Sequence, residues 1–191
     1  MIGTQDIILL ISKSQRDLKL KKKIYIIVGS SRNPGNTWTV ANELKNFKET
    51  ELVDLLSLEV SYFDYEHNNR DDDFIPLMKR MLSDASAIVF LTPIYWYTMS
   101  AVMKTFLDRF SDLLKIEKEL GRRLRGLSMA VLSTSESEDA PFHFDEPFQL
   151  SAEYLGMNYC GYEHTVVSNS LLQGESKKKA LNLMLNLTDK S

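Results

Sequence analysis

The feature that most constrains the fold is an apolar run followed by a short polar loop and an amphipathic helix, which first occurs at residues 23–48. The run at 23–28 is rich in β-branched residues and ends at a glycine, a pattern typical of a strand buried on both faces. Apolar residues then recur at helical spacing over residues 37–48. The loop between them therefore joins the end of a buried strand to the start of a helix.

The same alternation continues along the chain and predicts an α/β fold. Helices that alternate with strands are typical of a parallel sheet with helices on both faces, joined by right-handed crossovers. Apolar runs predict further strands at residues 51–56, 87–91, 127–133 and 158–165. Helical periodicity predicts helices at residues 74–82, 102–114, 144–155 and 175–187.

The first loop carries groups that suit an anion. Ser30, Asn36 and Thr37 offer short polar side chains, and Arg32 offers a guanidinium fork. The start of the following helix adds free N–H groups and a partial positive charge. A plain connection in which Asn36 or Thr37 only caps the helix has a similar composition, so this loop alone leaves both interpretations open.

A second loop, at residues 91–100, favours ligand binding. It also follows an apolar strand and precedes a helix, and open α/β sheets bind ligands at the carboxyl ends of their strands. Three consecutive aromatic residues begin at Tyr95. Because three neighbours cannot all point inward, at least one of them is expected at the surface or at a site.

Together the two loops resemble the flavodoxin-like NAD(P)H-dependent flavin mononucleotide (FMN) reductases and quinone reductases. That family carries a Gly-Ser-x-Arg-x-x-Gly-Asn-Thr phosphate loop, which residues 29–37 match. It also carries Pro-x-Tyr-Trp and then Met-Ser-Ala-x-x-Lys-x-Phe-x-Asp-Arg, which residues 93–96 and 99–109 match. The resemblance is carried mainly by residues 23–134 and continues more weakly beyond them.

The resemblance implies a flavodoxin-like, doubly wound, five-stranded parallel sheet of order 2-1-3-4-5 in a three-layer α/β/α architecture. This order places the switch point between the first and third strands, which the two loops follow. We expect one flavodoxin-like FMN-binding domain over residues 23–191. Residues 1–22 are expected to be an N-terminal extension, with an apolar segment at 7–11.

The resemblance also implies FMN as the cofactor and NAD(P)H as the reductant. The phosphate is expected on the first loop and the isoalloxazine ring on the second. A third loop, at residues 134–146, carries Ser and Thr where many relatives carry glycines. No catalytic side chain or metal ligand is expected, because the flavin carries the chemistry. The expected cofactor-binding residues are Ser30, Arg32, Asn36, Thr37, Pro93, Ile94, Tyr95, Trp96 and Thr134.

These expectations describe an oxidoreductase that accepts hydride from NAD(P)H and reduces a quinone, a flavin or a similar small acceptor. His143 in the third loop is the best candidate for contact with a substrate. One alternative is a flavodoxin-type electron carrier without a substrate site. Another is a redox-sensing or interaction protein that binds flavin without turnover. A Rossmann dinucleotide loop and a nucleotide-hydrolase P-loop are disfavoured, because residues 29–37 lack the glycine spacing of the one and the Gly-Lys of the other.

Composition limits the classes of partner that we expect for this protein. The net charge of −3 argues against a general nucleic-acid binder. The single cysteine excludes an internal disulfide, and no apolar run approaches membrane-spanning length. We therefore expect a cytoplasmic protein with a small-molecule electron acceptor and no nucleic-acid or membrane partner. The family resemblance implies a homodimer.

Overall fold

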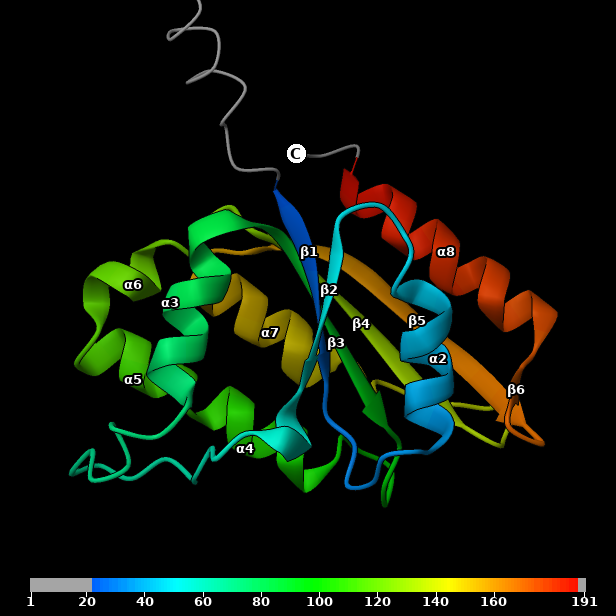
Figure 1. Ribbon diagram of the computed structural model, residues 1–191, viewed down its shortest axis with the longest axis horizontal. Coiled ribbons are helices and arrows are strands. Elements are labelled where there is room, and N and C mark those ends of the chain that lie inside the picture. The colour runs from blue at the N-terminus through cyan, green and yellow to red at the C-terminus, as the bar shows by residue number, and fades with distance from the viewer. Residues whose placement is uncertain (1–21, 189–191) are drawn as a thin grey trace, which may run out of the picture.

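The computed structural model describes residues 22–188 and confirms the three-layer α/β/α architecture (Figure 1). A central sheet carries α2 and α8 on one face and α3 to α7 on the other. All of the expected N-terminal extension except Lys22 lies outside the described residues. The helices of the model are α2 (Asn36–Leu44), α3 (Phe74–Asp84), α4 (Ala101–Asp108), α5 (Phe110–Lys115), α6 (Lys118–Arg122), α7 (Glu146–Leu155) and α8 (Gly174–Thr188), with a 3-10 turn, η1, at Leu55–Ser57.

The sheet has the strand order β2-β1-β3-β4-β5-β6. Its first five strands pair in parallel in the predicted order, and β6 pairs antiparallel with β5. The expectation of five strands was therefore one short, because a strand of two residues has no periodicity to detect. The strands are β1 (Lys23–Val28), β2 (Thr50–Asp54), β3 (Ala85–Pro93), β4 (Ser128–Ser135), β5 (Asn158–Ser168) and β6 (Leu171–Leu172).

Two predicted helices differ from the structure. The helix expected over residues 102–114 is two helices, α4 and α5, which meet at Arg109. The helix expected to reach residue 48 ends at Leu44, and the Phe47 N–H then donates to the Leu44 carbonyl in a turn. Phe47 still packs against the core, so its apolar spacing continues past the end of the helix.

The buried strand β1 divides the core into two layers. Tyr25 and Ile27 face the layer under α3 to α7, whereas Ile24, Ile26 and Val28 face the layer under α2 and α8. Helices cover both faces of β1. Because β1, β3 and β4 are parallel, their carboxyl ends lie at the same edge of the sheet. This edge positions the candidate site.

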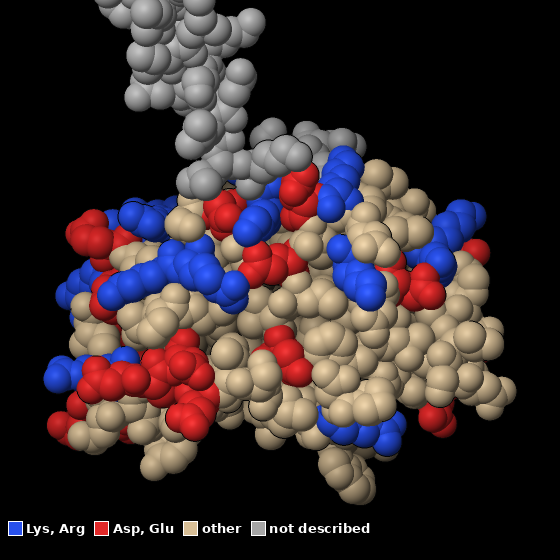
Figure 2. Space-filling view, in the orientation of Figure 1, with Lys and Arg blue, Asp and Glu red and all other residues tan. Residues whose placement is uncertain are grey.

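The surface has mixed charge, and Lys and Arg side chains are interspersed with Asp and Glu over the face in Figure 2. Among residues 22–188, no helix is both long enough and apolar enough to cross a membrane. The same part of the chain holds no group of three or more side chains arranged to bind a metal ion.

Candidate functional site

Three loops meet at the carboxyl edge of the sheet (Figure 1). The first loop (residues 29–35) follows β1, the second loop (residues 94–100) follows β3, and the third loop (residues 136–145) follows β4. Hydrogen bonds join the loops or the residues that border them. The donor and acceptor pairs are Ser31 Oγ to Tyr95 Oη at 3.0 Å, Asn36 Nδ2 to Glu136 Oε1 at 3.4 Å, and Ile94 N to Thr134 O at 3.1 Å.

Ser100 fixes the base of the first two loops. Its Oγ donates to the Gly29 carbonyl at 2.5 Å and accepts from the Met103 N–H at 3.1 Å, which makes Ser100 the N-cap of α4. A Cβ atom on Gly29 would lie 2.7 Å from the Met103 side chain, so only glycine fits there. Ser100 was not among the predicted site residues, although a serine just before a predicted helix is an N-cap signal.

The N-terminus of α2 lies beside the first loop without a side-chain cap. The N-cap residue is Gly35, with extended backbone and no side-chain hydrogen bond to the first turn. Asn36 and Thr37 are the first two residues of the helix, so the interpretation that either of them only caps it is wrong. The amide groups of the first turn therefore keep their capacity for an anion.

Ser30 and Arg32 shape the first loop. Ser30 is buried, and its Oγ donates to the Arg32 carbonyl at 3.0 Å. The Arg32 side chain folds against Gly35, where an added Cβ would lie 2.9 Å from its Nε atom. Because Arg32 is exposed, its guanidinium lies at the surface beside the start of α2 and adds positive charge there.

The second loop turns back tightly and displays two aromatic rings. Tyr95 and Thr98 exchange backbone hydrogen bonds of 2.9 and 3.1 Å, and Trp96 and Tyr97 between them have φ angles of 48° and 68°. Two left-handed central residues define a type I′ turn, so this backbone conformation fixes where the two rings project. Trp96 is 92% exposed and Tyr97 is 77% exposed, which confirms the prediction that the aromatic run reaches the surface.

A cavity of about 500 Å³ lies between the second and third loops. Ile94, Trp96 and Tyr97 line it on one side, and residues between Ser135 and Pro141 line it on the other. Its volume lies within the range of small-molecule and cofactor sites. His143 is exposed, has left-handed backbone and does not line this cavity.

Thr134 is buried at the end of β4, next to this cavity. Its register partner on β3 is Pro93, which is also buried. The Thr134 Oγ1 atom is buried and has no hydrogen-bond partner among residues 22–188. Buried hydroxyl groups nearly always have a partner, so an unpaired one beside Ile94 fits a hydrogen bond to a ligand.

A polar network anchors the third loop to β4 and β5. The Ser133 Oγ lies 2.7 Å from both Tyr162 Oη and His164 Nδ1, and His164 Nε2 lies 3.0 Å from the Ser137 carbonyl. Because a carbonyl only accepts, we assign the proton of this contact to His164 Nε2. Burial, together with nearby acidic residues, raises the pKa of Tyr162 to about 12, although its hydrogen bond to Ser133 opposes that rise. Tyr162 therefore stays a donor at neutral pH.

The structure brings the nine predicted residues to one edge of the sheet, although not all of them meet in one cavity. Ile94 and Trp96 line the cavity, and Tyr95 is bonded to the first loop. The Ile94 and Tyr95 N–H groups donate to protein carbonyls, so the loop presents its side chains at these two positions. The remaining predicted residues are Ser30 and Arg32 in the first loop, Asn36 and Thr37 at the start of α2, Pro93 at the end of β3, and Thr134 on β4.

Comparison with known proteins identifies relatives of this chain. A model of the NADPH-dependent FMN reductase family matches residues 22–170. The putative NAD(P)H-dependent FMN-containing oxidoreductase YwqN of Bacillus subtilis (strain 168) is 31% identical over 99 residues, which are 49% of this chain and 54% of that protein. The NADPH azoreductase of Bacillus sp. (strain OY1-2) is 32% identical over 90 residues, which are 47% and 51% of the two chains. The chain thus spans about half the length of the curated relatives that it matches.

A solved structure shares the fold. The general stress protein 14 of Treponema denticola, in complex with FMN, matches with a TM-score of 0.55 and 14% identity, over 89% of this chain and 99% of that one. At this identity the match shows the fold alone.

Proposed function

The chain belongs to the NADPH-dependent FMN reductase family, and from that premise we propose that it is an FMN-dependent oxidoreductase. It accepts hydride from NAD(P)H and reduces a quinone, a flavin or a similar small acceptor. The observation that carries this proposal is that an uncapped helix N-terminus and a cavity lined by exposed aromatic rings lie at the same edge of the sheet, at its switch point. We also propose that residues 23–191 form the one FMN-binding domain and that residues 1–22 extend it.

The described residues fit FMN. The amide groups at the start of α2 would hold its phosphate, together with Ser30 and the guanidinium of Arg32. The flavin ring would lie beside Ile94 and Trp96 in the second loop. The unpaired hydroxyl of Thr134 would then gain the hydrogen-bond partner that the described part of the chain does not provide.

FMN, when bound, supplies the electron chemistry, since it accepts two electrons and passes them on. The residues of this chain bind and orient the reactants. In the net reaction NAD(P)H and one proton convert a quinone into a hydroquinone and NAD(P)⁺. The hydride carries both electrons and one of the two protons that the hydroquinone gains.

A cavity borders the second loop, and we propose that the nicotinamide ring and the acceptor occupy it in turn. Initial rates measured with NADH and 2-methyl-1,4-naphthoquinone should then give parallel double-reciprocal lines. Intersecting lines would indicate a ternary complex and separate sites. If neither NADH nor NADPH reduced any acceptor, the proposed function itself would be contradicted.

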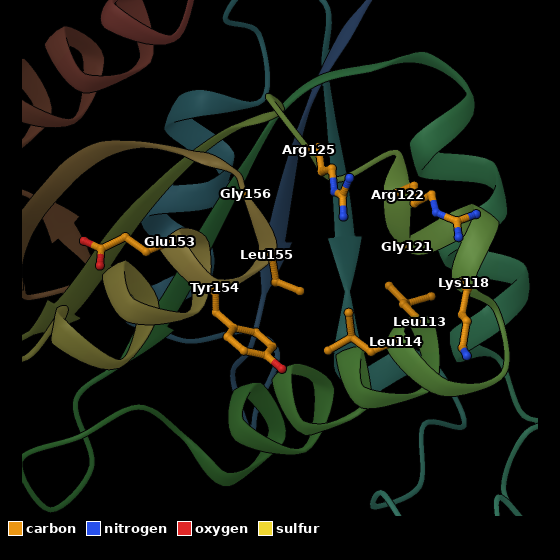
Figure 3. A pocket seen from close by; sticks show the side chains of 10 residues that line it. All are labelled: Leu113, Leu114, Lys118, Gly121, Arg122, Arg125, Glu153, Tyr154, Leu155 and Gly156. Atoms are coloured by element: carbon orange, nitrogen blue, oxygen red, sulfur yellow. The ribbon is translucent and has the colours of Figure 1, made fainter.

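We further propose a homodimer that forms through the face of α5, α6 and α7. Two adjoining hollows of about 430 and 310 Å³ lie on this face. Figure 3 shows Leu113 and Leu114 of α5 across from Tyr154 and Leu155 of α7. Leu150 and Tyr154 of α7 are exposed, and clustered exposed apolar side chains are typical of protein interfaces.

A further inference from the structure

We infer that the cavity between the second and third loops selects uncharged or cationic aromatic acceptors and discriminates against anionic ones. This inference rests on the proposed function, because it concerns the acceptor of the same site. It follows from the shape of the second loop, the charge of the third loop and the contacts that hold the third loop in place.

The second loop offers aromatic surface at a fixed position. Trp96 and Tyr97 project from a two-residue turn that backbone hydrogen bonds close on both sides. Ile94 adds an apolar surface to the same side of the cavity. Flat aromatic molecules stack on such rings, and cations are attracted to the faces of Trp and Tyr.

The opposite side of the cavity is acidic. Asp139 lines the cavity directly, and Glu138 precedes it in the chain. No Lys or Arg is among the described residues that line it. Like-signed charge along a cleft repels ligands of that sign and attracts the opposite one.

Further acidic side chains line a second hollow next to the cavity. A neighbouring hollow of about 660 Å³ shares Asp139 with the cavity and is lined by several charged side chains. Four of these are acidic and one is basic, so the net charge of this lining is negative. They are Glu138, Asp139, Glu163, Glu175 and Lys179.

Hydrogen bonds hold these acids in place. The third loop is tied down at Ser137, whose carbonyl contacts His164 Nε2 at 3.0 Å. The Ser137 Oγ in turn accepts from the Asp139 N–H at 3.2 Å, and the Ser137 N–H donates to Ser135 Oγ at 3.1 Å. The backbone that carries Asp139 is therefore anchored to β4 and β5.

The site is polarised as a result. Its positive groups, Arg32 and the start of α2, lie on the first-loop side, where the phosphate is proposed to bind. Glu138 and Asp139 lie on the third-loop side, whereas the Glu136 carboxylate accepts from Asn36 Nδ2 at the start of α2. An anionic acceptor would have to place its charge beside Asp139, whereas a neutral quinone takes up two electrons and two protons without a change of charge.

The first test compares two acceptors with one ring system, 2-methyl-1,4-naphthoquinone and 1,4-naphthoquinone-2-sulfonate. The ratio of their kcat/KM values is measured in the wild type and in the double variant Glu138→Gln/Asp139→Asn. Comparing this ratio between variants cancels the difference in reduction potential between the probes. We expect the preference for the neutral quinone to fall about fivefold in the variant and to fall in the wild type as salt increases.

The control variant is Asp71→Asn, because the Asp71 side chain is 92% exposed and does not line the cavity. Its ratio should match that of the wild type. A ratio that neither the double variant nor salt changes would overturn the inference, even if the neutral quinone is reduced well. The salt series on the wild type decides the question if the double variant does not fold.

The second test measures binding without turnover. The chain has two tryptophans, so Trp38→Phe leaves Trp96 as the only indole reporter. Its fluorescence is titrated with two redox-inert probes, phenyltrimethylammonium and benzenesulfonate. The cation should bind more tightly, and Glu138→Gln/Asp139→Asn should remove most of the difference. Equal or tighter binding of the sulfonate to the Trp38→Phe protein would overturn the inference, whether or not any quinone is reduced.

Discussion

Thr134 is the residue at which the candidate site departs most from an ordinary protein interior. Its hydroxyl is buried without a partner in the part of the chain that the structure describes, whereas Thr165, its register neighbour on β5, donates to the Ser133 carbonyl at 2.7 Å. The two threonines are register partners on neighbouring strands, but only Thr165 makes a side-chain hydrogen bond among residues 22–188. This contrast makes them a matched pair for mutation.

The first prediction concerns this pair. Thr134→Val should leave the melting temperature of the FMN-free protein unchanged or raise it, because no hydrogen bond is lost, and should weaken FMN binding by about 1 kcal/mol. Thr165→Val should lower the melting temperature, because a buried hydrogen bond is removed. Calorimetry and FMN fluorescence titration measure the two effects. Equal destabilisation by both substitutions would contradict the assignment of Thr134 to the flavin.

The second prediction concerns Arg32. Arg32→Ala should weaken FMN binding by about 1.5–3 kcal/mol, the value of a hydrogen bond to a charged group. Arg70→Ala, which removes another exposed arginine side chain, serves as the control and should leave the affinity unchanged. An FMN affinity that Arg32→Ala does not change would mean that Arg32 belongs to the general surface.

At the scale of elements, the buried Arg109 links the α4–α5 junction to the long connection between β2 and α3. Its guanidinium pairs with Asp72 and with Asp112, and donates to the Ser61 and Asn69 carbonyls at 3.1 and 3.0 Å. Burial would raise the pKa of Asp72, but the hydrogen bonds from Arg109 and from backbone N–H groups outweigh it and lower that pKa. Arg109 thus holds a connection that has little regular structure of its own.

The third prediction follows from this cluster. Arg109→Met should destabilise the protein by about 3–5 kcal/mol, because the buried Asp112 and the partly buried Asp72 lose this cation. Lys104→Met, which breaks the exposed pair with Asp108, should cost less than about 1 kcal/mol. Denaturant unfolding measures both. Similar losses in the two variants would contradict the structural role of Arg109.

The same cluster predicts how the free energy of unfolding changes with pH. A lowered folded-state pKa of Asp72 stabilises the protein above the unfolded value of about 3.9, and this stabilisation is lost as the pH falls below it. In the Arg109→Met variant, Asp72 should contribute less to the fall in unfolding free energy at acidic pH. Unfolding free energies measured from pH 6 downward test this.

The elements also show what sequence patterns can and cannot predict. Apolar runs predicted the core strands, because these strands are buried on both faces. The strand order came from the family resemblance that the motifs of the first two loops carry. The break at Arg109 was not predicted, because apolar residues keep their helical spacing across it from Phe106 to Phe110. The third-loop network depends on Ser133 and His164, which lie 31 positions apart and meet only across the ladder of β4 and β5.

At the scale of the whole molecule, the proposed dimer predicts a change in mass. Leu150→Glu/Tyr154→Glu places two charges on the α7 face and should convert a dimer into a monomer in sedimentation velocity. Leu171→Glu, at an exposed leucine on β6, should remain a dimer. A wild type that sediments as a monomer would contradict the proposal, as would a double variant that remains a dimer.

The central claim is that this chain binds FMN and that nicotinamide reduces it there. The most direct measurement is the visible spectrum of the FMN-loaded protein, recorded without oxygen and without any acceptor, before and after addition of NADH or NADPH. The account predicts that FMN binds at micromolar concentration and that at least one nicotinamide bleaches its absorption. The account is contradicted by a protein that ignores FMN at that concentration, and equally by a bound flavin that dithionite reduces but neither nicotinamide does, which is the behaviour of an electron carrier.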